Sequence, residues 1–198
     1  LSGMDKPTLG SIHFCGETIS DYSNDRLAIF RRKHCGFVFQ QIYLLDNMSI
    51  LDNVIAAGLL NSRNHKAVTA KAHAFFDEVG LDRSLRQKFP AQLSGGESQR
   101  AGIVRALINE PELVFCDEPT GQLNSASSKA VLDVLTAANH NGQSIIMVIH
   151  GLKTARRGDR ILYLQDGVIR GECRLGKYQP EDKERHQKLS SFLQEMGW

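Results

Sequence analysis

Leu93-Ser-Gly-Gly-Glu-Ser-Gln-Arg100 combines a glycine-rich loop with the start of a helix. The residues from Glu97 to Asn109 carry apolar side chains at helical spacing, which predicts a helix over this range. The glycines have no side chains, so backbone N–H groups at the helix N-terminus can approach an anion directly. Because the helix dipole contributes only about 0.3–2 kcal/mol per charge, this loop predicts one part of a phosphate site. Other segments must supply the rest.

A second motif, Glu112-Leu-Val-Phe-Cys-Asp-Glu-Pro-Thr-Gly121, follows shortly after the first. Its apolar run does not alternate with polar residues, which is typical of a parallel strand covered on both faces. In this order and at this distance, the two motifs resemble the signature motif and the Walker B segment of ABC-type ATPases, the nucleotide-binding domains of ABC transporters. Together with Gly36-Phe-Val-Phe-Gln-Gln41, the Asp117-Glu-Pro-Thr-Gly121 segment resembles the branch that contains lipoprotein-release, macrolide-efflux and cell-division ATPases.

The composition predicts a cytosolic protein of one domain. A chain of 198 residues is long enough for a substantial core, and a formal charge of +2 is too small to indicate nucleic-acid binding. The four cysteines are widely spaced and form no Cys-x-x-Cys pair, which predicts reduced thiols rather than a metal site or disulfides. The longest wholly apolar run, Ile145–Ile149, is too short to cross a bilayer, and no signal-peptide pattern opens the chain. If the protein acts in transport, we expect another chain to supply the membrane span.

The order of predicted elements is typical of an α/β fold. Buried strands are predicted at 36–40, 113–116 and 145–149, hairpins at 10–19 and 160–169, and a last amphipathic helix at 189–196. With the resemblance, this pattern predicts a P-loop NTPase-like, mostly parallel sheet flanked by helices, with antiparallel edge hairpins. Residues 1–198 are then one domain. We expect a helical subdomain of about residues 46–92, inserted in a RecA-like core of residues 1–45 and 93–198.

Each of the three predicted buried strands ends on polar residues of a catalytic type: Gln40, the pair Asp117-Glu118, and His150. In a doubly wound sheet, ligands bind beyond the carboxyl ends of the strands, so these residues can meet at one site. Each also has a simpler interpretation taken alone. Gln40 can merely close a strand, His150 can be a hydrogen-bonded core histidine, and the acidic pair can cap a helix. Their joint order and strand positions favour the functional interpretation.

The resemblance implies a role for each of these residues. Gln40 matches the glutamine that touches the metal and the attacking water, and that relays the nucleotide state to the membrane partner. Asp117 matches the aspartate that holds Mg²⁺ through water. Glu118 matches the catalytic glutamate that polarises the hydrolytic water, and His150 matches the histidine that contacts the γ-phosphate. The implied cofactors are ATP and Mg²⁺.

The resemblance also implies that ATP is shared between two subunits. Ser94, Gly95 and Gly96 match signature residues that bind the γ-phosphate of ATP held by the opposite subunit of a head-to-tail dimer. Glu97 and Asn124 are the remaining residues that we expect near nucleotide. Asn124 stands where the family has aspartate in its D-loop.

A further departure is Gly151, which follows His150 where the family usually has aspartate. Like the exchange at Asn124, it puts coupling across the dimer in question. Neither change removes a primary catalytic group.

A Walker A loop, Gly-x-x-x-x-Gly-Lys-Ser/Thr, should precede Gln40, and residues 1–198 contain none there. Leu1–Thr8 resembles the segment just after the Walker A helix, so we expect the chain to begin where the phosphate loop has ended. The near match Gly171-Glu-Cys-Arg-Leu-Gly-Lys-Tyr178 follows a predicted hairpin at the wrong end of the chain and has tyrosine at the Ser/Thr position. Losing even three charge-assisted hydrogen bonds of about 1.5–3 kcal/mol each would weaken nucleotide binding roughly a thousandfold or more. We therefore expect these residues alone to bind Mg-ATP weakly and to hydrolyse it negligibly.

The resulting hypothesis is an ATP-hydrolysing ABC transporter subunit, of exporter type. Its expected partners are an integral membrane permease and a second ATPase subunit, with no nucleic acid. Its expected location is the cytoplasm, at the inner face of the cell membrane. One alternative is a DNA-repair or chromosome ATPase head, which predicts a long heptad coiled coil or zinc-binding cysteines that this sequence lacks. Another is a non-catalytic half-site that offers only its signature face to an intact subunit. The transported substrate does not follow from the sequence.

Overall fold

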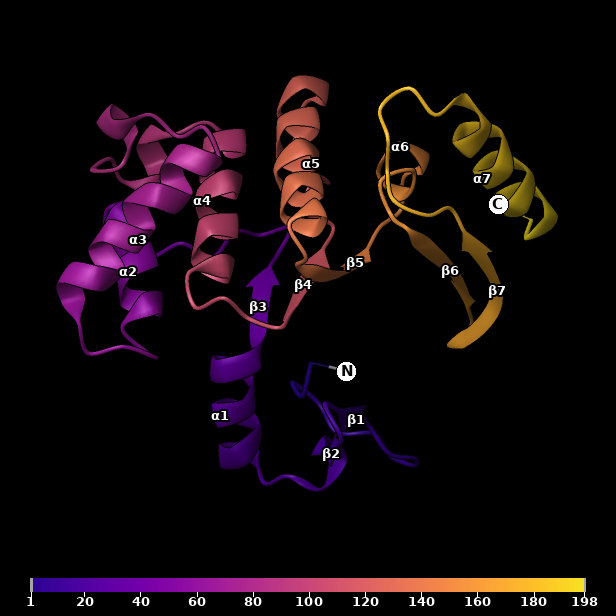
Figure 1. Cartoon of the computed structure of the whole chain (residues 1–198), viewed down its shortest axis with the longest axis horizontal. Helices are drawn as coiled ribbons and strands as arrows, with labels where there is room; N and C mark the ends of the chain where they lie inside the picture. The colour runs from indigo at the N-terminus through magenta and orange to yellow at the C-terminus, as the bar shows by residue number, and fades with distance from the viewer. Residues whose placement is uncertain (1, 198) are drawn as a thin grey trace.

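A computed structural model describes residues 2–197 and shows an α/β fold, as predicted (Figure 1). Its centre is a three-stranded parallel sheet in the order β3-β4-β5. These strands are β3 (Cys35–Val38), β4 (Leu113–Asp117) and β5 (Ser144–Val148). Helix α5 (Ser125–His140) connects β4 to β5, and its buried face packs on the sheet together with α4 (Gly95–Leu107). The sheet and these two helices carry the residues of the candidate site.

The helices between β3 and β4 form a second core. Helices α2 (Ile50–Gly58) and α3 (His65–Glu78) bury their apolar faces against each other and against α4. Gly58 allows the close approach of α2 to α3, because a Cβ atom at this position would lie 2.5 Å from Val68 Cγ1. Two 3₁₀ turns, η2 (Arg83–Leu85) and η3 (Pro90–Gln92), lead from α3 back to α4.

Two antiparallel hairpins flank the sheet, as predicted. Near the N-terminus, β1 (His13–Phe14) and β2 (Glu17–Thr18) precede η1 (Ile19–Asp21) and α1 (Asn24–His34). Near the C-terminus, β6 (Arg160–Gln165) and β7 (Val168–Arg174) follow the short helix α6 (Leu152–Ala155). The last helix, α7 (Lys183–Glu195), begins earlier than its apolar stripe suggested, because Asp182 accepts a hydrogen bond from Arg185 N and caps it.

The expectation that 145–149 is a buried strand is wrong. Strand β5 pairs with β4 but with no other strand of residues 2–197, so its second edge is open. Ile146 and Val148, the latter 54% exposed, alternate with the half-buried Ile145 and Met147, so they lie on the exposed face of β5, opposite the face that packs toward α5. An apolar run indicates a strand that is buried on both faces only when other elements cover both faces of the sheet.

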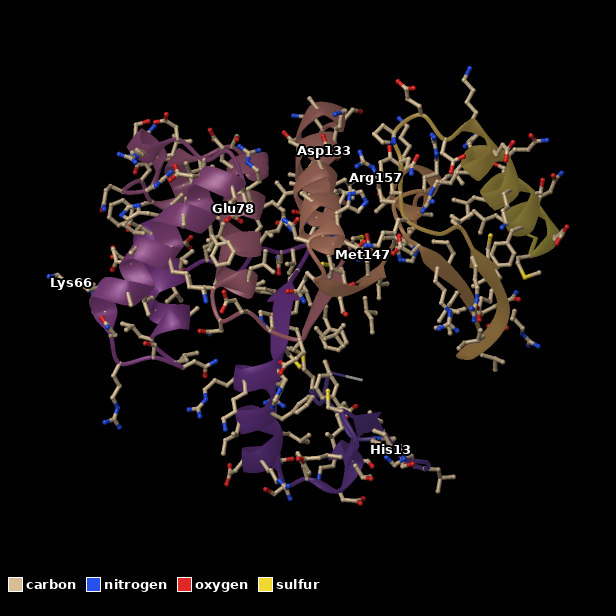
Figure 2. All side chains as sticks on the ribbon, viewed as in Figure 1. His13, Lys66, Glu78, Asp133, Met147 and Arg157 are labelled. Atoms are coloured by element: carbon tan, nitrogen blue, oxygen red, sulfur yellow. The ribbon has the colours of Figure 1, made fainter. Side chains whose placement is uncertain are left out.

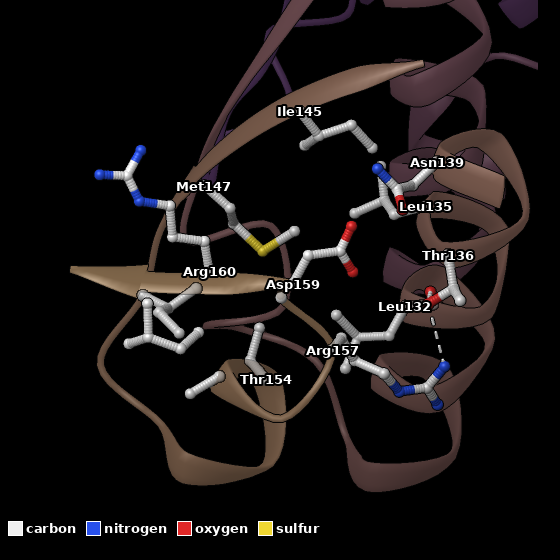
Figure 3. Close-up of a pocket in the computed structure, with 14 residues that line it drawn as sticks. Leu132, Leu135, Thr136, Asn139, Ile145, Met147, Thr154, Arg157, Asp159 and Arg160 are labelled. Atoms are coloured by element: carbon white, nitrogen blue, oxygen red, sulfur yellow. Dashed lines mark hydrogen bonds between the residues drawn. The ribbon is translucent and has the colours of Figure 1, made fainter. Parts of the chain in front are cut away.

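A cavity of about 220 Å³ lies beside this open edge (Figure 3). Its walls come from α5, from the inner side chains of β5, from α6 with the turn after it, and from the start of β6. Arg157 of that turn forms an ion pair with Asp133 of α5, with 2.8 Å between the charged groups (Figure 2).

Among the described residues, no helix is both long enough and apolar enough to span a membrane.

Candidate functional site

Three side chains of a catalytic type meet just beyond the carboxyl ends of the central strands. Glu118 Oε1 lies 3.0 Å from His150 Nε2. The Glu118 N–H donates to Val148 O at 3.0 Å, which ties the end of β4 to the end of β5. A Cβ atom added at Gly121 would lie 2.7 Å from Gln40 Nε2 and 3.1 Å from Glu118 Oε2. The structure therefore places Gln40 and Glu118 beside Gly121, and His150 in contact with Glu118.

The backbone of Glu118 is held in an uncommon conformation. Its φ angle is +42°, in the left-handed region that non-glycine residues seldom adopt. Two main-chain hydrogen bonds hold it there, one to Val148 O and one from Gly121 N to Glu118 O at 3.0 Å. The resulting turn directs the carboxylate toward His150. The His150 side chain is 76% exposed, so this histidine is not a core residue.

The donor atoms beside this cluster are of the type that Mg²⁺ prefers. Asp117 is the exposed last residue of β4, next to Glu118. Residues 2–197 contain no group of three or more His, Cys, Asp or Glu side chains able to hold a metal. Mg²⁺ needs no such cage, because it is usually bound by one or two carboxylates, water and substrate phosphates. The Asp117 carboxylate and the Gln40 amide oxygen fit that chemistry.

Burial raises the pKa of the neighbouring Cys116 thiol to about 12, which keeps this thiol protonated and inert.

Ser94 and Glu97 form a closed capping box at the N-terminus of α4. The Ser94 hydroxyl donates to Glu97 Oε2 at 2.7 Å, the Ser94 N–H donates to the same oxygen at 2.7 Å, and Glu97 N donates to Ser94 Oγ. These hydrogen bonds hold the pKa of Glu97 below its ordinary value. The carboxylate of Glu97 is thus turned back onto the loop. Ser94 and Gly95 are exposed, and they leave the helix N-terminus open to solvent.

Gly96 is buried and faces the first turn of α5. A Cβ atom at Gly96 would lie 2.9 Å from both Cβ and Oγ of Ser127. Asn124 is the N-cap of α5, and its Oδ1 accepts from Ser127 N at 2.9 Å. Ser127 therefore packs against the loop before α4 and donates a hydrogen bond to the loop before α5.

The predicted residues fall into two groups. Gln40, Glu118 and His150 form one, with Asp117 beside them, and the residues from Ser94 to Glu97 form the other with Asn124. Within residues 2–197, no side-chain hydrogen bond or ion pair joins the two groups. Sequence reasoning missed Gly121 and Ser127, which pack the groups into place. Ser127 could have been found from the cap rule, because it stands three residues after Asn124.

The comparisons with known proteins concern the family and the fold of the chain. Residues 1–121 match the family model described as ABC transporter. The chain is 41% identical over 173 residues to the lipoprotein-releasing system ATP-binding protein LolD of Aquifex aeolicus, covering 87% of this chain and 76% of that protein. It is 40% identical over 169 residues to an uncharacterised ABC transporter ATP-binding protein of Methanocaldococcus jannaschii, covering 85% of this chain and 75% of that protein. It is 38% identical to the macrolide export ATP-binding/permease protein MacB of Haemophilus ducreyi, of whose length it covers only 24%.

Among solved structures, the chain resembles the dimeric structure of MJ0796, described as a bacterial ABC transporter cassette. The TM-score is 0.80 at 32% sequence identity, over 89% of this chain and 78% of that one. A dimeric post-hydrolysis state of the same cassette, bound to ADP and Pi, gives the same TM-score of 0.80.

Proposed function

This chain belongs to the ABC transporter family as an ATP-binding domain, and on that premise we propose that it is the ATP-hydrolysing part of an exporter and works with an integral membrane permease. The observation that carries the proposal is that Gln40 and Glu118 lie together beside Gly121 and that Glu118 contacts His150. A carboxylate and an imidazole in contact at the carboxyl ends of parallel strands suit the activation of water beside a phosphate.

In the proposed reaction, Glu118 acts as the general base that accepts a proton from the attacking water. A positioned base of this kind accelerates hydrolysis about 10²–10⁴-fold. His150 orients the Glu118 carboxylate through the 3.0 Å contact, and we assign the terminal phosphate as its second partner. Asp117 and Gln40 would hold Mg²⁺, which when bound neutralises charge on the phosphates.

We further propose that a strand and phosphate loop from outside residues 1–198 complete the site. The open edge of β5 supports this, because a parallel strand added there would end at the same edge as His150. The apolar walls of the adjoining cavity would suit its side chains, as Figure 3 shows for Leu132, Leu135, Ile145 and Met147. Residues 1–198 alone are then expected to bind Mg-ATP weakly and to be nearly inactive.

We propose that the permease docks beside the Gln40 segment, on helices that belong to an inserted helical subdomain of about residues 46–92. Tyr43 and Leu45 of the Gln40 segment and Phe89 of the subdomain are exposed apolar side chains. The Leu45 N–H donates to Asn53 Oδ1 at 2.7 Å, and Ile50 N donates to Lys88 O at 3.0 Å, which brings the three segments together. This surface would place the chain at the cytoplasmic face of a membrane.

A second copy of the chain is the proposed partner for the exposed Ser94-Gly95 loop, which would then face the ATP of the opposite subunit. The dimeric structures of the similar cassette support this proposal. The second candidate function is a non-catalytic half-site that offers only this loop. The exposed Ser94-Gly95 backbone and the presence of Asn124 in place of aspartate favour it.

The test is to join residues 1–198 to a strand followed by a Walker A phosphate loop, placed so that the strand can pair with β5, and to measure ATP hydrolysis. We expect the extended chain to hydrolyse ATP, and Glu118→Gln to lower kcat about 100-fold or more while nucleotide still binds. The matched control is Glu110→Gln, which removes an exposed carboxylate paired with Lys71 far from the site and leaves the rate unchanged. If the extended chain binds ATP but is no faster than its Glu118→Gln variant, the half-site function is correct instead.

A further inference from the structure

The segment Phe39–Leu45, here called the Gln40 loop, is fastened to helix α4 by side-chain hydrogen bonds. Gln99 Nε2 donates to Phe39 O at 3.1 Å, and Gln99 is only 2% exposed. Arg105 donates from one guanidinium nitrogen to Ile42 O at 2.7 Å and from the other to Tyr43 O. The backbone on both sides of Gln40 is thus held by one helix.

The three positions of contact lie on one face of α4. Gln99, Gly102 and Arg105 follow one another at intervals of three residues, which places them along one side of a helix. Gly102 has no room for a side chain, because its Cβ atom would lie 2.9 Å from Ile42 Cγ2. The loop therefore lies directly against the backbone of α4 between two side-chain anchors.

Arg105 directs its donors to main-chain oxygens, and it forms no ion pair with any carboxylate in the described part of the chain. A planar guanidinium can hold two carbonyl groups at once in a fixed geometry, and a lysine cannot. Tyr43, one of the two residues held, has a φ of +52°, which costs conformational energy unless neighbouring contacts maintain it. The far end of the loop is held by Asn53, which both donates to Leu45 O and accepts from Leu45 N.

Helix α4 also begins at the Ser94-Gly95-Gly96 loop. One rigid helix therefore carries the signature loop at its N-terminus and the Gln40 loop along its side. Gln40 in turn reaches toward Gly121 and Glu118. Because Ile103 of α4 packs in one buried cluster with Val114 of β4, the contacts of the loop with α4 also fix the position of Gln40 relative to Glu118.

We propose that Gln99 and Arg105 are positioning residues, which hold the backbone on both sides of Gln40 on α4 and so set the placement of Gln40 beside Glu118. This inference rests on the proposed function, because that function gives Gln40 its role. Neither residue contacts the reacting groups. Their effect is exerted through the backbone of the loop.

The first experiment measures backbone order in residues 1–198 by ¹⁵N relaxation, without nucleotide. In Arg105→Gln, we expect the order parameters of residues 41–44 to fall from the rigid range of about 0.85 to below about 0.6. Arg105→Lys should show a smaller fall, because one ammonium group retains one of the two contacts. The matched control is Arg157→Lys, another partly buried arginine, whose partners are Asp133 and Thr136. It should leave the loop rigid.

The proposal is overturned if the loop stays rigid in both Arg105 variants. It is also overturned if order falls equally over α2, α3 and α4, since that would show a general structural role. Should Arg105→Gln fail to fold, Arg105→Lys and Gln99→Met provide the same comparison.

A second experiment separates this proposal from the proposed function. In the extended, active chain, Arg105→Lys should lower kcat several-fold with KM for ATP unchanged, because Arg105 is remote from nucleotide contacts. A change in KM alone would contradict positioning of Gln40. If the extended chain proves inactive, the proposed function fails, while the loop-order result still decides whether Arg105 fixes the loop.

Discussion

The two edges of the central sheet differ in how closely other elements of residues 2–197 pack against them. Along β3, helix α4 packs so closely that a Cβ atom at Gly36 would lie 2.5 Å from Ala106 O, and the loop that follows is held by Gln99, Arg105 and Asn53. Along β5, the outer edge is unpaired and Val148 is 54% exposed. The difference shows that elements of residues 2–197 pack closely along the β3 side of the sheet, whereas the outer edge of β5 is free to pair with the further strand that we propose.

The largest expected difference between the two sides is in the unfolding free energy that is lost when a large side chain is shortened. Ile103 on α4 is fully buried against the sheet. Ile103→Ala should lower the free energy of unfolding by about 2–5 kcal/mol, as large-to-small changes in a packed core do. Val148→Ala at the open edge should cost about 1 kcal/mol or less, because little of that side chain leaves water on folding. Urea unfolding of both variants measures the contrast, and equal losses would show that the β5 edge is as well packed as the β3 side.

Glycine substitutions should show the same asymmetry on a smaller scale. Gly36→Ala forces a methyl group onto Ala106 O and the Pro111 ring, and should destabilise by about 1–3 kcal/mol. Gly151 has open space around it and a φ of −130°, which alanine adopts without strain. Gly151→Ala should therefore be neutral or stabilise by up to about 1 kcal/mol. Thermal unfolding distinguishes the two, and a loss at Gly151 would contradict the open surroundings.

The cap of α5 lies between the two sides. Asn124→Ala removes the hydrogen bond to Ser127 N and should cost about 1 kcal/mol of stability. Asn124→Asp keeps the acceptor and adds a negative charge at a helix N-terminus, which favours the folded state by about 0.3–1 kcal/mol. Unfolding curves at low salt should rank aspartate above asparagine and alanine last. An alanine variant as stable as the parent would refute the capping role.

The smallest predicted effect is a pH dependence at the start of α4. Hydrogen bonds from Ser94 lower the pKa of Glu97 in the folded protein, so the ionised carboxylate stabilises the fold above the unfolded pKa. That contribution is lost as the pH falls through the lowered folded pKa. An acid titration followed at the Ser94 amide by NMR should show the capping box opening below the normal carboxyl range. In Glu97→Gln this titration step should vanish. A step that persists would assign it to another group.

Much of the fold was predictable because its signals are local. Helical spacing predicted α4 and the second half of α7, and the strand patterns predicted the hairpins within 10–19 and 160–169. The exposure of β5 was not predictable, because it depends on which elements cover the face that carries Ile146 and Val148. The anchoring roles of Gln99 and Arg105 were also not predicted. Their partners are backbone carbonyl groups far away in sequence, and the pattern of side chains does not indicate such contacts.

The most direct measurement is an equilibrium titration of Mg-ATP on two proteins, residues 1–198 alone and the same residues joined to a strand and phosphate loop. We predict no saturation in the micromolar range for residues 1–198, and an affinity roughly a thousandfold or more higher once the phosphate loop is present. Micromolar binding by residues 1–198 alone would contradict the account.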